Sequence, residues 1–192
     1  MEQPQIEVFY PQNTMAFRNW LQENHISKQA VWIVFHKKAS KKESLSWSEA
    51  VDVALCFGWI DSKKIKINDE TSHQFFSKRK EKSTWSKINK EKISRLIADG
   101  LMTEAGYKSI ETAKQNGSWT ILDEVEELIV PDDLEEACKS HEGSKDYFLG
   151  LSKSSKKMIL HWIVLAKRPE TRQKRIAEIA ECAAKQQKPK HM

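Results

Sequence analysis

A run of tryptophans and basic residues is the chemically most suggestive part of the sequence. It begins at Trp59 and continues through lysine-rich segments to Trp85 and beyond. Indole rings stack on bases and other flat rings, while ammonium and guanidinium groups attract phosphate. The run therefore predicts a surface that binds nucleic acid or a phosphorylated ligand. The residues assigned to this first basic surface are Trp59, Asp61, Lys63, Lys64, Arg79, Trp85, Lys87 and Asn89.

The same residues also have a purely structural interpretation. Tryptophan is usually highly buried, so Trp59 and Trp85 are also expected as interior residues that hold a hairpin to a helix. The lysines would then be an ordinary solvated face. Asp61 follows an apolar pair and, if partly buried, needs cationic or backbone partners to stay ionised. It is expected more as a structural anchor than as a general base.

A second basic surface is predicted where one helix ends and the next begins, in "AKRPETRQKRI". Basic side chains and a hydroxyl beside the free N–H groups of a helix start can form a cradle for an anion. The alternative is an internal salt network with residues 123–136, which carry eight acids and no base. The sequence leaves both open. The residues of this second basic surface are Lys167, Arg168, Thr171, Arg172 and Arg175.

An enzymatic alternative is built on Cys56 as a nucleophile, with His36 or His73 as the base and Asp61 as the group that orients it. Cys56 lies in the apolar run "ALCFG", where an inert core thiol is the default. No catalytic residue is assigned for this reason. A third alternative is a protein-interaction module whose acidic segment 123–136 recruits basic partners.

No pattern for a metal or a cofactor is found. The six histidines show no HxxxH or HxH grouping, and the chain has neither a glycine-rich phosphate loop nor a GxSxG elbow. We therefore expect no cofactor and no metal, and an anionic molecule or nucleic acid as the partner. The oligomeric state is not indicated.

Composition favours a globular protein of a reducing compartment. The chain has 192 residues, a net charge of +5 and three widely spaced cysteines without CxxC spacing, so no disulfide framework is predicted. The N-terminal residues do not resemble a secretory signal, and no segment has the length and apolarity of a membrane span. We expect a cytoplasmic location without insertion into a membrane.

The N-terminal half is predicted to mix strands and helices. Residues 31–37, "VWIVFHK", have the composition of a central strand covered on both faces. Ser46 and Glu49 have the spacing of a capping box, and Gly58 stands where a left-handed residue would end the helix. After it the period changes to two, which predicts a hairpin strand with Trp59, Asp61 and Lys63 on one side.

The remainder is predicted to be helical, with a second capping box at Asp132 and Glu135 and a helix that begins at Pro169. The fold class is therefore α+β: a small antiparallel or mixed sheet with helices, followed by a helical C-terminal half. The stretch "DEVEELIVPDD" is the expected joint. It divides an α+β lobe, residues 1–122, from a helical lobe, residues 123–192, which could still pack as one domain.

Three long segments resemble one protein family. They are "EAVDVALCFGWIDSKK", "KSTWSKINKEKISRLIADGLMTEAG" and "LSKSSKKMILHWIVLAKRPETRQKRIAEI". In this order they are similar to the bacteriocin-protection, YdeI/OmpD-associated family, from about residue 17 to residue 184. The resemblance implies a small bacterial protein associated with stress or with survival against antimicrobial peptides. It implies no reaction and no catalytic residue.

Overall fold

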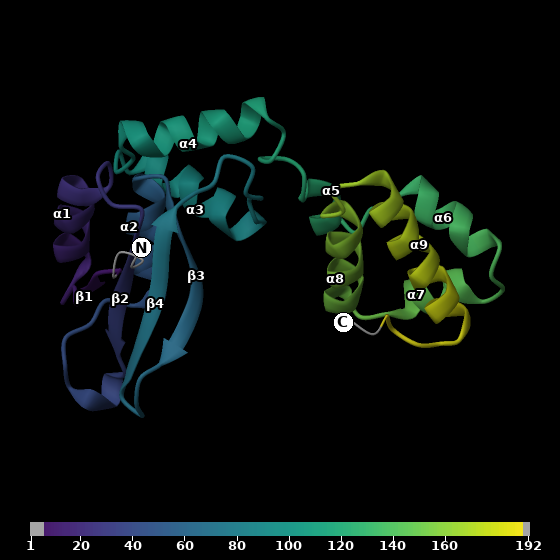
Figure 1. Cartoon of the computed structure of the whole chain (residues 1–192), viewed down its shortest axis with the longest axis horizontal. Helices are drawn as coiled ribbons and strands as arrows, with labels where there is room; N and C mark the ends of the chain where they lie inside the picture. Colours follow the sequence, from purple (N-terminus) through teal and green to yellow (C-terminus); the bar gives the residue numbers. More distant parts are fainter. Residues whose placement is uncertain (1–5, 190–192) are drawn as a thin grey trace, which may run out of the picture. The chain divides into compact units, whose positions relative to one another are not determined.

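The computed structural model describes residues 6–189, and within them the chain separates into two compact units that divide between Trp119 and Thr120. Strands and helices make up the N-terminal unit, whereas the C-terminal unit is entirely helical (Figure 1). The predicted α+β class is confirmed. Each unit buries a hydrophobic core of its own.

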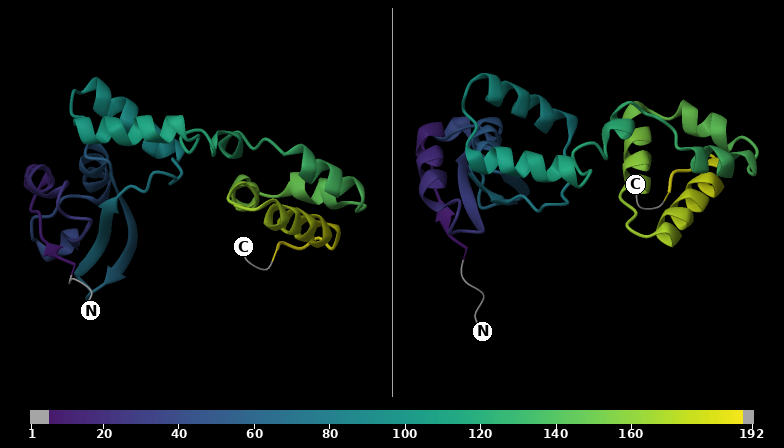
Figure 2. Two further views of the ribbon diagram at one scale, coloured as in Figure 1. Left: turned by 45° about the horizontal axis from the view of Figure 1, so that its top comes forward. Right: turned by 90° about the horizontal axis from the view of Figure 1, so that it is seen from above.

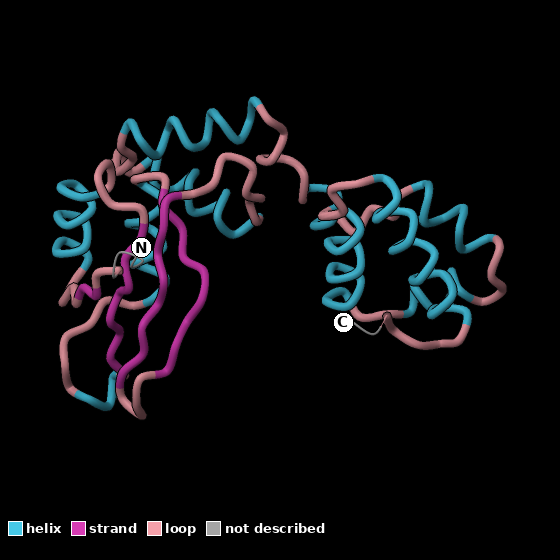
Figure 3. Tube along the Cα trace, in the orientation of Figure 1, coloured by secondary structure: helices cyan, strands magenta, loops and turns pink. Residues whose placement is uncertain are grey.

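The N-terminal unit is built on a four-stranded mixed sheet of order β1-β2-β4-β3 (Figure 3). Strand β1 (Val8–Phe9) runs parallel to β2 (Ala30–His36), and β2 pairs antiparallel with β4 (Thr71–Lys78). Strand β3 (Trp59–Lys66) forms a hairpin with β4 and lies at the free edge of the sheet. The predicted hairpin is therefore present.

Helices pack on one face of this sheet. The helices that contact the sheet are α1 (Thr14–Asn24) and α2 (Trp47–Cys56), while α3 (Lys87–Ala98) and α4 (Glu104–Gln115) pack against α2. A short 3-10 helix, Lys38–Ser40, follows β2. In α1, Phe17 lies edge-on to Phe76 of β4 and Trp20 lies edge-on to Trp59 of β3. These aromatic contacts join α1 to the sheet, and α2 packs against both α1 and β3.

The prediction that β2 is covered on both faces is wrong. Only Val31 and Ile33 are buried, and the other five residues of β2 are partly exposed. The physical reason is that helices cover one face of the sheet only. On the other face Trp32 packs against Phe75 of β4, with ring centroids 4.9 Å apart, and these two rings shield one another in place of a helix.

The predicted alternation along β3 is also interrupted. Asp61 pairs with Phe76 and Lys64 pairs with Gln74, so three steps on β3 correspond to two on β4. This is a β-bulge, in which one strand carries an extra residue. Because Phe76 and Gln74 share the helix-covered face, Asp61 and Lys64 lie on that face too. Lys63, predicted beside Asp61, is turned to the opposite face.

Local capping signals determine most of the helix ends. Both hydrogen bonds of the Ser46–Glu49 capping box are present, and Gly58 follows α2 with a φ of +70°. The second predicted box is wrong: helix α6 has Pro131 as its N-cap, without a side-chain cap. Proline has a fixed φ and an extended ψ here, so the helix begins at Asp132 and the Asp132–Glu135 spacing falls one residue late.

Within the described residues, the C-terminal unit has five helices around one hydrophobic core. Figure 2 shows the course of these helices from two further directions. The longest of them begins at Pro169, as predicted, because the fixed φ of proline suits the first helical position. The helices are α5 (Asp123–Glu126), α6 (Asp132–Lys139), α7 (Ser144–Gly150), α8 (Lys153–Val164) and α9 (Pro169–Ala184). Across residues 6–189, no helix combines the length and apolarity that a membrane span requires.

Candidate functional site

The two tryptophans of the first basic surface lie in the interior. Trp59 is 0% exposed and Trp85 is 1% exposed, and both belong to the core of the N-terminal unit. Trp59 lies against Trp20 of α1, and Trp85 lies 4.9 Å from Trp119, centroid to centroid. Neither ring presents a face to solvent, so a solvent-facing hollow formed by these two indoles is not present. The interior interpretation of both rings describes the structure.

Arg79 is the one cation of that surface that lies against one of its predicted tryptophans. Its guanidinium carbon is 3.6 Å from the centre of the Trp85 ring, and Nη2 donates to the Thr84 carbonyl at 2.6 Å. Burial lowers the pKa of Arg79 to about 10, and the charge of Asp61 opposes this shift. Arg79 therefore remains protonated at neutral pH although it is largely removed from water.

The remaining cations of the first basic surface lie apart from the tryptophans assigned to it. Lys87 is exposed at the start of α3, and Asn89 donates its backbone N–H to Ser86 Oγ as part of the helix cap. Lys63 lies over Trp32 and Phe75 on the open face of the sheet, 5.4 and 5.3 Å from the ring centres. The bulge explains this position, because it reverses the side from which Lys63 projects.

Lysines on β3 also have a structural role. A free edge strand presents unpaired N–H and C=O groups, and natural proteins protect such edges with lysines and bulges. Strand β3 has both: a bulge after Asp61, and Lys63, Lys64 and Lys66 along its length. Edge protection therefore explains why β3 is rich in lysine without invoking a ligand. Of these three lysines, Lys64 lines the pocket described next.

A pocket of about 490 Å³ lies on the helix-covered face of the sheet, where α2 begins. At its centre one carboxylate oxygen, Asp61 Oδ2, accepts two hydrogen bonds. Trp47 Nε1 donates at 2.8 Å and Gln74 Nε2 donates at 2.9 Å. The second hydrogen of the Gln74 amide is directed to the Ser62 carbonyl at 3.2 Å. Asp61 is therefore an anchor that holds Trp47, which agrees with the structural role expected for it.

Trp47 is the exposed aromatic group of this pocket, with 53% of its surface accessible. Its hydrogen bond to Asp61 fixes the plane of the ring, and Gln74, only 5% exposed, fixes Asp61 in turn. Side chains that are oriented by such a second layer lose little freedom when a ligand binds. The geometry is that of a preorganised aromatic platform beside a polar pocket.

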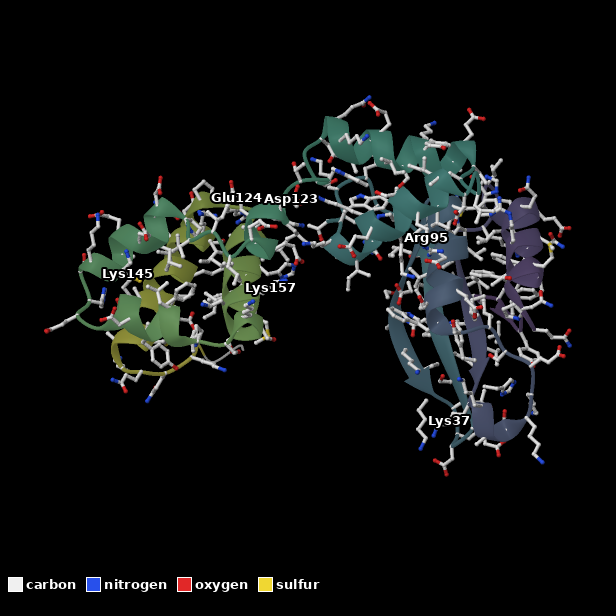
Figure 4. The ribbon with its side chains drawn as sticks, turned by 180° about the vertical axis from the view of Figure 1, so that it is seen from behind. Lys37, Arg95, Asp123, Glu124, Lys145 and Lys157 are labelled. Atoms are coloured by element: carbon white, nitrogen blue, oxygen red, sulfur yellow. The ribbon has the colours of Figure 1, made fainter. Side chains whose placement is uncertain are left out.

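Cations outnumber acids around this pocket, which we name the Trp47 pocket. Lys37 and Lys64 are exposed, and Asp61 is the carboxylate among the lining residues. Figure 4 shows Lys37 at the end of β2. His36, which also lines the pocket, has its Nδ1 3.1 Å from Thr71 Oγ1. The lining residues are Phe35, His36, Lys37, Leu45, Ser46, Trp47, Asp61, Lys64, Ser72 and Gln74.

Sequence reasoning missed Trp47 and Gln74. Trp47 is the first residue of a predicted helix, which is normally a solvent-exposed position, and Gln74 is a polar residue in a strand. An exposed tryptophan at a helix start is a signal that could have been used, since large exposed apolar side chains often mark binding sites. The pairing of Gln74 with Asp61 depends on strand register, which the bulge changes.

The residues of the second basic surface differ in their surroundings: two arginines contact groups of their own unit, whereas two other cations are exposed. Arg172 forms a two-point ion pair with Asp133 of α6, at 2.6 Å from Nε and 2.9 Å from Nη2. This pair lowers the pKa of Asp133 and raises the pKa of Arg172, mainly through the hydrogen bonds between them. Arg175 donates to the Trp162 carbonyl and lies over its ring. Lys167 and Arg168 are exposed, and Thr171 is half-buried.

Acids of residues 123–136 pair with bases of their own unit. Glu126 accepts from Lys157 at 2.6 Å, and Glu135 accepts from Lys145 at 3.1 Å. Figure 4 labels both lysines, which come from α8 and α7. Neither lysine belongs to the second basic surface. Within residues 6–189, Arg172 is the member of that surface that forms an ion pair with this acidic segment, so the internal pairing expected as the alternative is present for one of its residues. Part of the acidic charge is thus neutralised inside the unit.

The residues of the enzymatic alternative do not meet. Cys56 is 1% exposed among the core residues, and burial raises the pKa of its thiol. Asp61 is bonded to Trp47 and Gln74, while His73 projects from the opposite face of the sheet. Within residues 6–189, no hydrogen bond joins Cys56, Asp61 and either histidine. The geometry therefore lacks a nucleophile–base pair at these positions.

The thiols are expected to differ in reactivity with Ellman's reagent at pH 8. Cys182 is partly exposed, whereas Cys56 and Cys138 are buried and free. The native protein should release one equivalent of chromophore rapidly and the other two only after denaturation, because a buried thiol is inaccessible to the reagent. Cys182→Ser should abolish the rapid phase. A rapid phase that survives in this variant would instead show an activated Cys56 or Cys138.

A metal site is likewise not found: across residues 6–189, no group of three or more histidine, cysteine or acidic side chains is placed so that it could hold a metal ion.

Comparison with known proteins divides the chain in two. Residues 9–109 match a family model described as a domain of unknown function, DUF8412. Residues 127–186 match a model described as bacteriocin-protection, YdeI or OmpD-associated. Only the last of the three segments that carry the resemblance lies in this second region. Neither a curated protein nor a solved structure matches the chain. The second match indicates a bacteriocin-protection-type protein.

Proposed function

Because the chain belongs to the DUF8412 family over residues 9–109 and carries a bacteriocin-protection, YdeI/OmpD-associated domain over residues 127–186, we propose that it serves such protection by binding an anionic ligand. The proposed ligand is a small phosphorylated molecule with a planar ring, such as a nucleotide. It is bound in the Trp47 pocket and is not turned over. The proposed location is the cytoplasm, which the free state of all three cysteines supports.

The observation that carries this proposal is the exposed indole of Trp47, held in place by the carboxylate of Asp61. An exposed ring whose plane is already fixed offers a ligand a flat face without further loss of side-chain freedom. A flat ring of a ligand is suited to this position, because stacking on an indole is favourable for every nucleobase. The pocket volume of about 490 Å³ is within the usual range for small-molecule sites.

Hydrogen bonding adds a second element of recognition. Within residues 6–189, Asp61 Oδ1 accepts no hydrogen bond, since Trp47 and Gln74 both donate to Oδ2. Oδ1 can therefore accept from an N–H of a base or from a sugar hydroxyl. A carboxylate cannot donate at neutral pH, so a ligand that offers only acceptors at this point is disfavoured.

The charge of the pocket supports a phosphate group on the ligand. Lys37 and Lys64 are exposed beside the pocket and form no ion pair within the described residues. A lysine is a mobile point charge that binds phosphate without strict geometry. The carboxylate of Asp61 opposes this charge only in part. We therefore expect affinity for phosphorylated ligands to fall as salt concentration rises.

Isothermal titration calorimetry at low salt, with AMP, ribose 5-phosphate and adenosine as ligands of the full chain, tests the proposal. AMP should bind most tightly, because it alone presents both the ring and the phosphate. Trp47→Ala should weaken AMP binding by about ten- to a hundredfold, since stacking of a base is worth about 1–3 kcal/mol. Lys64→Ala should weaken AMP more than adenosine, because adenosine lacks the phosphate.

Tyr107→Ala is the matched control, because Tyr107 is a similarly exposed aromatic residue on α4, outside the Trp47 pocket. It should bind AMP as the wild type does. A single-stranded oligonucleotide is titrated in parallel, and tighter binding of the strand through Trp47 would identify a nucleic acid as the partner. The proposal fails if the wild type binds none of these probes, or if Trp47→Ala binds AMP with unchanged affinity.

A further inference from the structure

A second pocket, of about 590 Å³, lies at the end of β4 and shares no lining residue with the Trp47 pocket. It is lined in part by Trp59, Lys78, Arg79, Glu104 and Lys108. We propose that this pocket binds an oxyanion, the carboxylate or phosphate group of a small molecule, and that Arg79 is the residue that recognises it. We name it the Arg79 pocket. This site is independent of the function proposed for the Trp47 pocket.

The guanidinium of Arg79 has unused donors in a place that water does not reach. Nη2 donates to the Thr84 carbonyl, but Nε and Nη1 are buried and have no acceptor within residues 6–189. Trp59 Nε1, which belongs to another residue lining the same pocket, is also buried without an acceptor. Nearly all buried polar groups in native proteins are hydrogen-bonded, so three such atoms around one pocket require an explanation.

The contact with Trp85 does not provide these hydrogen bonds. The guanidinium lies 3.6 Å from the ring centre, where the π face attracts the positive charge from one side of the guanidinium plane. The N–H bonds of arginine lie within that plane and are directed away from the ring that it stacks on. The contact with the Trp85 ring therefore compensates part of the positive charge of Arg79 and leaves its donors at Nε and Nη1 without acceptors.

No acid of the described chain neutralises Arg79 directly. Asp61 influences Arg79 through its charge and forms no hydrogen bond with it within residues 6–189. The hydrogen bonds that Asp61 accepts come from Trp47 and Gln74. Glu81 and Glu104 line the pocket, but both are exposed, and neither forms an ion pair with Arg79 within residues 6–189. Lys108 is an exposed cation of the same pocket. A buried arginine without a carboxylate partner is the arrangement expected when an external oxyanion supplies the countercharge.

Binding must involve a local movement, since the free donors are covered in the unliganded chain. We expect the guanidinium to turn from Trp85 toward the pocket as the oxyanion enters. The stack on Trp85 weakens while charge-assisted hydrogen bonds form. Both changes are visible in the nuclear magnetic resonance (NMR) signals of the Arg79 Nε–H and the Trp59 indole N–H.

Titration of the full chain with inorganic phosphate, and separately with acetate, followed by ¹⁵N NMR, tests this site. In the wild type the Arg79 Nε–H and Trp59 indole signals should shift and saturate. In Arg79→Gln the affinity should fall at least tenfold, with an intermediate loss in Arg79→Lys. Arg95→Gln is the matched control, because Arg95 pairs with Asp52 and does not line the Arg79 pocket. It should bind the anion as the wild type does.

Trp47→Ala should also leave phosphate binding at the Arg79 pocket unchanged, so failure here is distinct from failure at the Trp47 pocket. The inference is overturned if neither anion moves the Arg79 signal, or if Arg79→Gln retains wild-type affinity. It is equally overturned if only surface lysine signals shift, which would mean nonspecific ion binding. Should Arg79→Gln fail to fold, the wild-type Arg79 signal and the Arg79→Lys variant decide the question.

Discussion

Replacing Trp59 by alanine is expected to lower the free energy of unfolding of the N-terminal unit by about 3–5 kcal/mol, the usual cost of removing a buried tryptophan side chain. Trp59 is 0% exposed, begins β3 and lies edge-on to Trp20 of α1. The substitution opens a cavity where α1 meets the sheet, and the surrounding backbone can close it only in part. Urea unfolding followed by tryptophan fluorescence and circular dichroism measures the loss.

The control for this prediction is Trp47→Ala in the same unit. Trp47 is 53% exposed, so its removal deletes one surface hydrogen bond and little buried area. We expect a loss of about 1 kcal/mol or less. A similarly small loss of unfolding free energy in both variants would contradict the burial of Trp59 and would indicate that its indole lies at the surface. A large loss for Trp59→Ala alone would establish its role as a core residue.

Replacing Gly106 by alanine is expected to destabilise the N-terminal unit by about 1–3 kcal/mol, the typical cost of overpacking a core. Gly106 lies in the first turn of α4, which packs against the end of α2. A Cβ at this position would lie 2.3 Å from the Cys56 carbonyl oxygen and 2.6 Å from Met102 Cε. Thr103 donates hydrogen bonds to the Cys56 carbonyl from both its backbone N–H and its Oγ1. The carbonyl cannot move away from a new Cβ without weakening these two hydrogen bonds.

The sign of this effect opposes helix propensity. In an exposed helix interior, alanine is favoured over glycine by about 1 kcal/mol. Gly150→Ala in α7 is the control, because a Cβ there would meet nothing within 4 Å. It should be neutral or slightly stabilising. Thermal unfolding of both variants compares them, and a Gly106→Ala protein as stable as the wild type would show that α4 and α2 do not pack as closely as described.

The two proposed binding pockets would use aromatic rings in opposite ways. In the Trp47 pocket the ring is exposed and would contact the ligand itself. Trp85, by contrast, is buried outside the lining of the Arg79 pocket and contacts the Arg79 guanidinium with its face. In the sequence, Trp47 and Trp85 look alike, because each is a tryptophan close to basic residues. The difference is one of burial, and it decides whether a substitution affects binding or stability.

Local signals allowed part of the fold to be predicted. The Ser46–Glu49 box, Gly58 after α2 and Pro169 at the start of α9 act through atoms a few residues apart, so their geometry follows from the sequence. The Asp132–Glu135 box failed for a local reason as well, because Pro131 took the cap position. The α+β class followed from where the hydrophobic period changed from two to 3.6.

The sequence by itself determined the starts of α2 and α9, the end of α2, the strand-containing first half and the family resemblance of the C-terminal unit, because these depend on neighbours along the chain. Tertiary structure alone decided that Trp59 and Trp85 are interior, that the bulge separates Lys63 from Asp61, and that Trp47 and Gln74 join Asp61. The reason is that burial and strand register are set by contacts between residues distant in sequence, and one extra residue in β3 reverses the side on which every later side chain lies.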